Sequence, residues 1–224
     1  MSLARNCEDV DEAVSGVADG STILIGGFGM AGMPIELIDA LVRQGATGLT
    51  VVSNNAGNGD VGLAALLAKG HVAKMICSFP RQSDSWVFDR LYRAGAIELE
   101  VVPQGNLAER LRAAGAGVGA FYSPTGVGTD LANGKEVRFF DGVPMTLEMP
   151  IKGDFALIAA HRADRMGNLV YRKTARNFGP VMATAAEVSV AQVREVVETG
   201  ALDPEAVVTP SIYVDRFVRV REAA

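Results

Sequence analysis

The chain has 224 residues, of which 49% are hydrophobic, and a formal net charge of −5 at pH 7. That length accommodates one large domain or two small ones with an ample core. The mildly acidic balance argues against nucleic-acid binding, and no apolar run approaches the roughly 18 residues of a membrane span. The N-terminus lacks the basic and apolar regions of a signal peptide, so we expect a cytoplasmic location with no membrane contact.

The first half of the chain predicts strands and helices in alternation. Asn6 can cap a helix that ends near Gly20, and residues 23–25 form an apolar run that suits a buried strand. A helix then opens at Pro34 and ends at Gly45, because proline favours the start of a helix and glycine its end. Further strands are expected over residues 49–53, 73–78 and 97–102, with helices over residues 62–69, from Ser83 to Gly95, and from Leu107 to Gly115.

The pattern changes after Gly115. Residues 137–140 and 143–149 flank Asp141-Gly142, which is a strong hairpin signal. Residues 155–160 and 169–171 flank a second turn, so this part is predicted to be antiparallel. A helix over residues 178–186 and strands over 188–193 and 212–220 follow. We therefore predict an α/β fold with an open, mostly parallel sheet, helices on both faces and an antiparallel β insertion packed against that sheet.

A glycine-rich loop follows the strand over residues 23–25. Its glycines are Gly26, Gly27, Gly29 and Gly32. Such loops let a backbone approach a ligand closely, and free N–H groups stand at the start of the next helix. The spacing of the last three fits a dinucleotide fingerprint, which predicts an acidic residue about 20 residues on. The next strand ends in Ser53-Asn54-Asn55 without an acid, which argues against a nicotinamide cofactor; a tight turn without a ligand stays open.

The stretch over residues 19–34 resembles the A-chain signature of the family I CoA-transferases: Asp-Gly, an apolar run, Gly-Gly-Phe and Gly-x-Pro. The resemblance continues in chain order through residues 53–57, 103–105, 124–129 and 172–178. It is greatest to A subunits that act on 3-oxoadipate. It implies a single CoA-transferase domain over residues 1–224 and transfer of CoA from succinyl-CoA to 3-oxoadipate in the catabolism of aromatic compounds.

The resemblance also implies a partner. In this family a glutamate carboxylate takes the acyl group and then CoA, and it lies in a Glu-Asn-Gly sequence on the B subunit. No Glu-Asn-Gly occurs here, and the glutamates present, Glu148 among them, lie in patterns that suit solvated faces. We expect the B subunit as the partner in an A2B2 heterotetramer, no permanently bound cofactor, and CoA, succinyl-CoA and small carboxylic acids as substrates.

Polar residues follow two of the predicted strands. Gln104 lies past the carboxyl end of one strand, where open α/β sheets bind ligands. Its match to the family's Pro-Gln-Gly motif implies a catalytic donor to an oxyanion or a substrate carboxylate. Asn54 and Asn55 end another strand, and the resemblance implies that they bind a substrate carboxylate. The alternative is a turn in which asparagine bonds its own backbone. The glycine loop, together with Phe28, is assigned to CoA binding.

Arg81 is the predicted determinant of the acceptor. It follows the strand over residues 73–78, and 3-oxoadipate carries a second carboxylate where acetoacetate has a methyl group. A buried unpaired carboxylate is costly, and arginine binds carboxylates with two hydrogen bonds. The alternative is a surface ion pair of Arg81 with Asp84.

Several alternatives stay open. Arg172, Lys173 and Arg176 form either a solvated face or a contact with CoA phosphates or the B subunit. The two cysteines are expected to be reduced, with Cys77 in the core, and no metal site is predicted because the two histidines share no ligand spacing with carboxylates. The competing functions are the A subunit of an acetoacetate transferase and a non-enzymatic α/β nucleotide-binding module.

Overall fold

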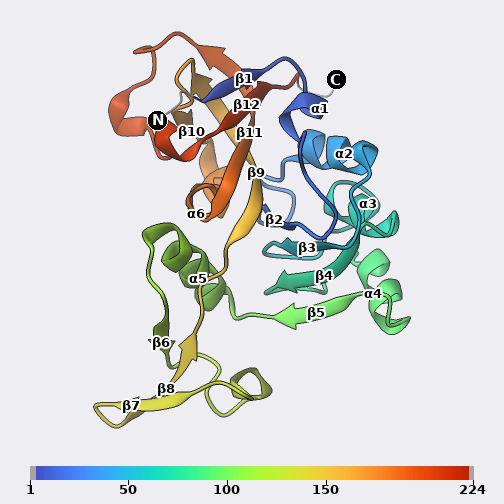
Figure 1. Cartoon of the computed structure of the whole chain (residues 1–224), viewed down its shortest axis with the longest axis vertical. Coiled ribbons are helices and arrows are strands. Elements are labelled where there is room, and N and C mark those ends of the chain that lie inside the picture. The colour runs from blue at the N-terminus through green and yellow to red at the C-terminus, as the bar shows by residue number, and fades with distance from the viewer. Residues whose placement is uncertain (1–3, 222–224) are drawn as a thin grey trace.

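A nine-stranded sheet forms the centre of the computed structural model, which describes residues 4–221 (Figure 1). Its strands are β1 (Arg5–Cys7), β2 (Thr22–Ile25), β3 (Leu49–Val52), β4 (Val72–Cys77), β5 (Glu98–Val101), β9 (Gly153–Asp164), β10 (Leu169–Val170), β11 (Ala186–Val197) and β12 (Arg216–Arg219). Their order is β1-β12-β11-β9-β2-β3-β4-β5, and every pair along it is parallel. Only β10 pairs antiparallel, with β9.

The direction of strand addition reverses between β2 and β9. From β2 the chain adds β3, β4 and β5 on one side, and from β9 it adds β11 and β12 on the other. The two strands at the reversal pair in parallel, with Ile25 beside Leu157. Ligands of open α/β sheets bind outside the carboxyl ends of the strands at such a switch point. The glycine loop begins one residue after Ile25 and therefore lies at this position.

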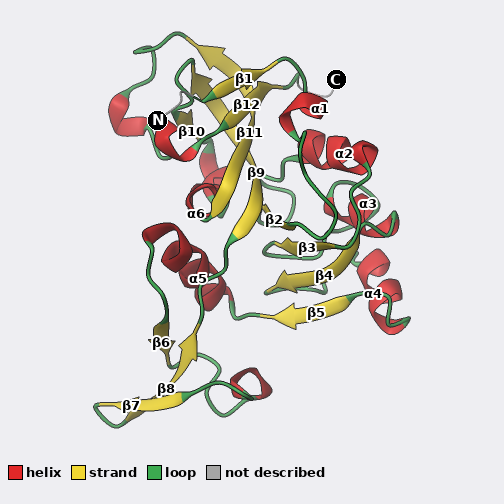
Figure 2. Ribbon diagram, viewed as in Figure 1, coloured by secondary structure: helices red, strands yellow, loops and turns green. Residues whose placement is uncertain are grey.

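Helices cover both faces of the sheet (Figure 2). On one face lie α1 (Val10–Ala13), α2 (Ile35–Gln44), α3 (Leu63–Ala68) and α4 (Trp86–Arg93); on the other lie α5 (Gln104–Ala116) and α6 (Gly179–Thr184). Ile23 and Ile25 pack in the first layer and Leu24 in the second, because successive side chains of a strand point to opposite faces. Short 3-10 turns are η1 (Asp130–Ala132), η2 (Lys173–Arg176), η3 (Pro204–Ala206) and η4 (Ser211–Tyr213).

A three-stranded antiparallel sheet projects from the main body (Figure 1). It contains β6 (Phe121–Ser123), β7 (Val137–Phe140) and β8 (Val143–Glu148) in the order β6-β8-β7. The predicted hairpin is confirmed: Asp141 and Gly142 connect β7 to β8 with φ angles of 49° and 78°. Positive φ at both central residues is what a tight turn between twisted strands requires. This small sheet leaves α5 at one end and returns to β9 at the other.

The first helix is shorter than predicted and begins at another cap. Residues 5–7 form β1, which pairs with β12 from the far end of the chain, and α1 has only four residues. Asp9, not Asn6, caps α1, since its carboxylate accepts a hydrogen bond from the Glu12 backbone N–H at 2.8 Å. Local sequence does not reveal β1, because this strand forms by pairing with β12 from the other end of the chain.

Three further boundaries differ from prediction. Helix α5 runs through Gly115 and ends before Gly117 at φ 70°. Gly115 is instead required by packing, because an added Cβ would collide with Thr184 of α6. The strand predicted over residues 155–160 is β9, which lies inside the parallel sheet and not in an insertion. Of the predicted strand over residues 212–220, only β12 is extended in the sheet.

Candidate active site

The glycine loop makes a tight turn at the switch point. Phe28 and Ala31 exchange backbone hydrogen bonds, with the N–H of Phe28 donating at 3.0 Å and that of Ala31 at 3.2 Å. Gly27 has a φ of 129°, which L side chains rarely adopt. At Gly32 an added Cβ would lie 2.5 Å from the carbonyl oxygen of Ala175 in η2. Glycine at this position therefore lets the loop touch η2.

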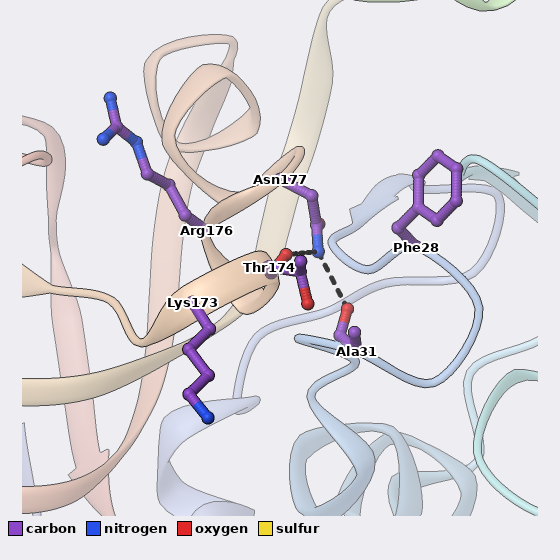
Figure 3. A pocket seen from close by; sticks show the side chains of 6 residues that line it. All are labelled: Phe28, Ala31, Lys173, Thr174, Arg176 and Asn177. Atoms are coloured by element: carbon purple, nitrogen blue, oxygen red, sulfur yellow. Dashed lines mark hydrogen bonds between the residues drawn. The ribbon is translucent and has the colours of Figure 1, made fainter.

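A pocket of about 640 Å³ lies between the glycine loop and η2 (Figure 3). Asn177 ties the two segments together, since its Nδ2 donates to the carbonyl oxygens of Ala31 at 2.8 Å and Thr174 at 2.7 Å. Phe28 stands on the opposite side and is 50% exposed. Asn177 was not among the site residues predicted from sequence. Its position in the motif over residues 172–178 could have identified it.

Two of the three basic residues near η2 line this pocket, namely Lys173 and Arg176. Lys173 adopts a φ of 52°, an uncommon conformation for a residue with a side chain. Arg172 lines a neighbouring pocket behind the loop, together with His161 and Arg194. All three residues are exposed, and they line two different pockets.

A second pocket, of about 330 Å³, contains Gln104 and adjoins the first. The two share Phe28 and Asn177, and the second is completed by residues of α5 and α6 and the residue before α6: Gly105, Ala108, Phe178 and Val181. The structure therefore brings Gln104 beside the glycine loop. None of the residues that line these two pockets is acidic.

Gln104 is the first residue of α5 and contacts Asn54. Its Nε2 donates to Asn54 Oδ1 at 2.6 Å. An amide nitrogen carries two hydrogens, so the second stays available to a ligand in the pocket. Asn54 is 1% exposed, and its own Nδ2 has no partner among the described residues. Asn54 therefore fixes the direction in which the Gln104 amide points.

Asn55 adopts the turn that we gave as the alternative. Its Oδ1 accepts a hydrogen bond at 2.9 Å from the backbone N–H of Gly57, and the residue is buried. The backbone of Asn55 also bridges to Phe79, which joins the loops after β3 and β4. The structure brings Asn54, but not Asn55, to Gln104.

Arg81 lies away from both pockets. Its Nε forms an ion pair at 2.5 Å with Asp89 Oδ1 on α4, and its side chain is 54% exposed. Arg81 thus forms a surface ion pair, as in the alternative given above, but its partner is Asp89 and not Asp84. In this geometry the guanidinium interacts with the next helix and not with Gln104.

Among residues 4–221, the cysteines and the metal-ligating side chains form no second reactive site. Burial raises the pKa of the Cys77 thiol to about 12, which leaves it protonated and unreactive. Cys7 and Cys77 are both buried and unbridged. Within residues 4–221, no three or more His, Cys, Asp or Glu side chains gather as metal ligands. The same part of the chain has no helix of the length and apolarity needed to cross a membrane.

The expectation that Glu148 lies on a solvated face was wrong. It is 1% exposed and forms an ion pair with Lys135 at 2.6 Å. Alternation along β8 turns this residue toward α5, and the start of the helix covers it. It lines neither of the two pockets beside Gln104.

Comparisons with known proteins identify the family. The family model described as Coenzyme A transferase matches residues 7–219. The A subunit of a 3-oxoadipate CoA-transferase from Pseudomonas putida is 66% identical over 99% of this chain and 96% of its own length. The A subunit of a succinyl-CoA:3-ketoacid coenzyme A transferase from Xanthomonas campestris pv. campestris strain B100 is 53% identical over 96% of this chain and 88% of its own.

A solved structure shows the same fold. The acyl-CoA transferase YdiF from Escherichia coli O157:H7 superposes with a TM-score of 0.84 at 23% identity. The match covers 97% of this chain and 47% of YdiF, so the chain spans about half the length of that protein. With a family model over nearly its whole length and the relatives above, the chain belongs to the coenzyme A transferase family.

Proposed function

We propose that this chain is the A subunit of an enzyme that moves CoA from succinyl-CoA to 3-oxoadipate. The observation that carries the proposal is the Gln104 amide, fixed by Asn54 at the carboxyl edge of the sheet and open to a pocket beside Phe28. The acceptor is supported by the relative at 66% identity, which is named as the A subunit of a 3-oxoadipate CoA-transferase.

The chemistry requires a carboxylate nucleophile. The nucleophile attacks the succinyl thioester carbonyl, CoA leaves as a thiolate, and a mixed anhydride forms. The thiolate then attacks the enzyme's acyl carbon, which releases succinate and leaves an enzyme–CoA thioester. The acceptor carboxylate repeats these steps in reverse. Each attack places negative charge on a carbonyl oxygen, and the free N–H of Gln104 stabilises that charge.

The nucleophile comes from the partner, the B subunit. No acidic residue lines the two pockets that contain Phe28 and Asn177 beside Gln104, which supports a nucleophile from outside this chain. The YdiF chain is about twice the length of this chain, which leaves room for a second half of similar size. We assign the catalytic glutamate to that second half and propose an A2B2 assembly in the cytoplasm.

The pockets also suit the parts of the substrates that lie beyond the reacting carbonyl group. Lys173 and Arg176 line the larger pocket and attract the phosphates of CoA, which binds as a substrate and not as a resident cofactor. Phe28 and Ala31 line the other side of this pocket, and the glycines of their loop, Gly26, Gly27, Gly29 and Gly32, let its backbone approach CoA closely. Asn55 holds its own turn with Gly57, and Arg81 is the group that meets the second carboxylate of 3-oxoadipate.

Acetoacetate, the alternative acceptor, has one observation in its favour. Arg81 lines neither pocket beside Gln104, and its Nε pairs with Asp89. That arrangement favours acetoacetate, and the relative at 53% identity belongs to a succinyl-CoA:3-ketoacid transferase. Binding of 3-oxoadipate by Arg81 therefore requires this side chain to turn toward the pocket.

The experiment is a comparison of acceptors. The chain is purified, combined with its B subunit, and supplied with succinyl-CoA and either 3-oxoadipate or acetoacetate. We expect kcat/KM to be higher for 3-oxoadipate. A higher value for acetoacetate would make acetoacetate the preferred acceptor. No turnover with either acid would overturn the proposed function.

A further inference from the structure

A buried polar network joins the first turn of α5 to the projecting sheet. Asn106, two residues after Gln104, is 4% exposed. Its Nδ2 donates to Glu148 Oε1 at 3.2 Å, and its Oδ1 accepts from Ser123 Oγ at 2.9 Å. Both ends of the Asn106 amide are therefore held by strands of the small sheet, β8 and β6.

Glu148 is the charged centre of this network. Its Oε1 accepts from Lys135 Nζ at 2.6 Å and from Thr146 Oγ1 at 3.4 Å, in addition to Asn106. A buried carboxylate without such partners is costly, so each donor has a fixed place. Asn106 must present its N–H group, and not its oxygen, to Glu148.

The loop over residues 124–129 is attached to the same network. The backbone N–H of Thr125 donates to Ser123 Oγ at 3.2 Å, and Asn106 Nδ2 also approaches the Thr125 carbonyl oxygen at 3.5 Å. One turn further along α5, Arg110 donates to the Met149 carbonyl oxygen at 2.6 Å and pairs with Glu100 at 3.0 Å. The contact of Asn106 is thus the one nearest to Gln104.

We infer that Asn106, held by Glu148, is a positioning residue for Gln104, an inference that rests on the proposed role of Gln104. The two residues share the first turn of α5, so a shift of Asn106 moves the Gln104 amide with it. Asn106 and Glu148 line neither pocket beside Gln104 and act only through the helix. A displacement of about 1 Å at a reacting group costs up to about a hundredfold in rate.

The test exchanges the two functional groups. Asn106→Asp puts a second carboxylate against Glu148, and like charges repel. Adding Glu148→Gln to that variant gives a pair with the same net charge as wild type. The carboxylate is then at position 106 and the amide at position 148. We expect the single variant, in complex with the B subunit, to lose about tenfold or more in kcat with KM for succinyl-CoA nearly unchanged. The double variant should recover most of that loss and return to within about threefold of wild type.

A second readout does not depend on activity. Hydrogen–deuterium exchange of the peptide over residues 104–111 should be faster in Asn106→Asp than in wild type and slower again in the double variant. Wild-type kcat in a folded Asn106→Asp complex would overturn the inference, as would a kcat that stays low in a double variant with normal exchange. If the wild-type complex has no turnover, the proposed function fails, and the exchange data alone decide whether Asn106 fixes the first turn.

Discussion

At the scale of single residues, the site rests on the hydrogen bond between Gln104 and Asn54. Both are neutral amides, and only their mutual arrangement gives one N–H a fixed direction toward the pocket. A preorganised donor stabilises a developing oxyanion because it needs no reorientation during the reaction. Asn54 thus fixes the amide that we propose as the donor.

Gln104→Ala should lower kcat of the assembled enzyme by about 10²–10³, the usual loss for one oxyanion donor. Steady-state turnover of succinyl-CoA with 3-oxoadipate measures the effect. Gln104→Glu is the matched control: it keeps the shape but replaces the donor by an acceptor, and it should be at least as impaired. Near-normal turnover in an intact complex would make Gln104 a structural residue.

Arg81→Met should reduce kcat/KM for 3-oxoadipate by about ten- to a hundredfold and leave acetoacetate nearly unchanged, since a charge-assisted hydrogen bond contributes about 1.5–3 kcal/mol. Asp89→Asn provides the control, because it releases Arg81 from its ion pair and should not weaken 3-oxoadipate. Equal losses for both acceptors, or no loss for either, would remove Arg81 from the specificity pocket.

The buried thiol of Cys77 makes stability depend on pH. Burial raises its pKa from 9.0 to about 12. The folded chain keeps a proton that the unfolded chain releases, so the stability from the neutral thiol is complete below pH 9 and is lost as the pH rises from 9 to about 12. Between about pH 8 and pH 10, urea unfolding should show the advantage of wild type over Cys77→Ala falling by about 1.4 kcal/mol. A constant difference would contradict this.

At the scale of elements, the site is a contact between two loops. The glycine loop and η2 are separated by about 140 residues of sequence and meet through Gly32 and Asn177. Asn177 joins them by hydrogen bonds, and Gly32 permits their approach. The larger pocket exists because this contact holds its two walls in place.

Gly32→Ala and Gly29→Ala form a matched pair. Both glycines have positive φ, so each substitution costs about 1 kcal/mol in backbone strain. At Gly32 the new Cβ also meets the Ala175 carbonyl oxygen, whereas at Gly29 it enters open space. Overpacking should add about 1–3 kcal/mol to the loss at Gly32 alone. Equal unfolding free energies for the two variants would show that η2 moves aside.

Sequence predicted the elements whose signal is local. The apolar run at residues 23–25, the glycine that ends α2 and the Asp141-Gly142 turn each specify their structure without distant contacts. Sequence could not place β9, since its apolar residues read as an antiparallel strand until β2 and β11 flank it on either side. It missed β1 for the same reason, because only β12 makes that segment a strand.

The same distinction applies to the site. Strand ends placed Gln104 and Asn54 at one edge, because the carboxyl ends of parallel strands meet there. Their direct hydrogen bond, the turn at Asn55 and the partner of Arg81 depend on side-chain directions that spacing does not encode. The buried Glu148 went unrecognised because its cover comes from α5, more than 30 residues earlier in the chain.

At the scale of the whole molecule, our proposal makes the chain one half of a reaction centre. The open sheet places Gln104, the glycine loop and two basic residues at one edge, and no acidic residue among the described ones lines the two pockets there. The chain alone should therefore show no transferase activity, and activity should appear when the B subunit is added. The central claim is that the covalent intermediate forms on the partner and not on this chain.

Intact-mass spectrometry tests that claim most directly. The assembled complex is incubated with succinyl-CoA, denatured in acid, and the masses of the two chains are measured separately. We predict that the B subunit gains the mass of CoA, joined with loss of water, and that the mass of this chain stays unchanged. The adduct on this chain, with its partner unmodified, would contradict the account.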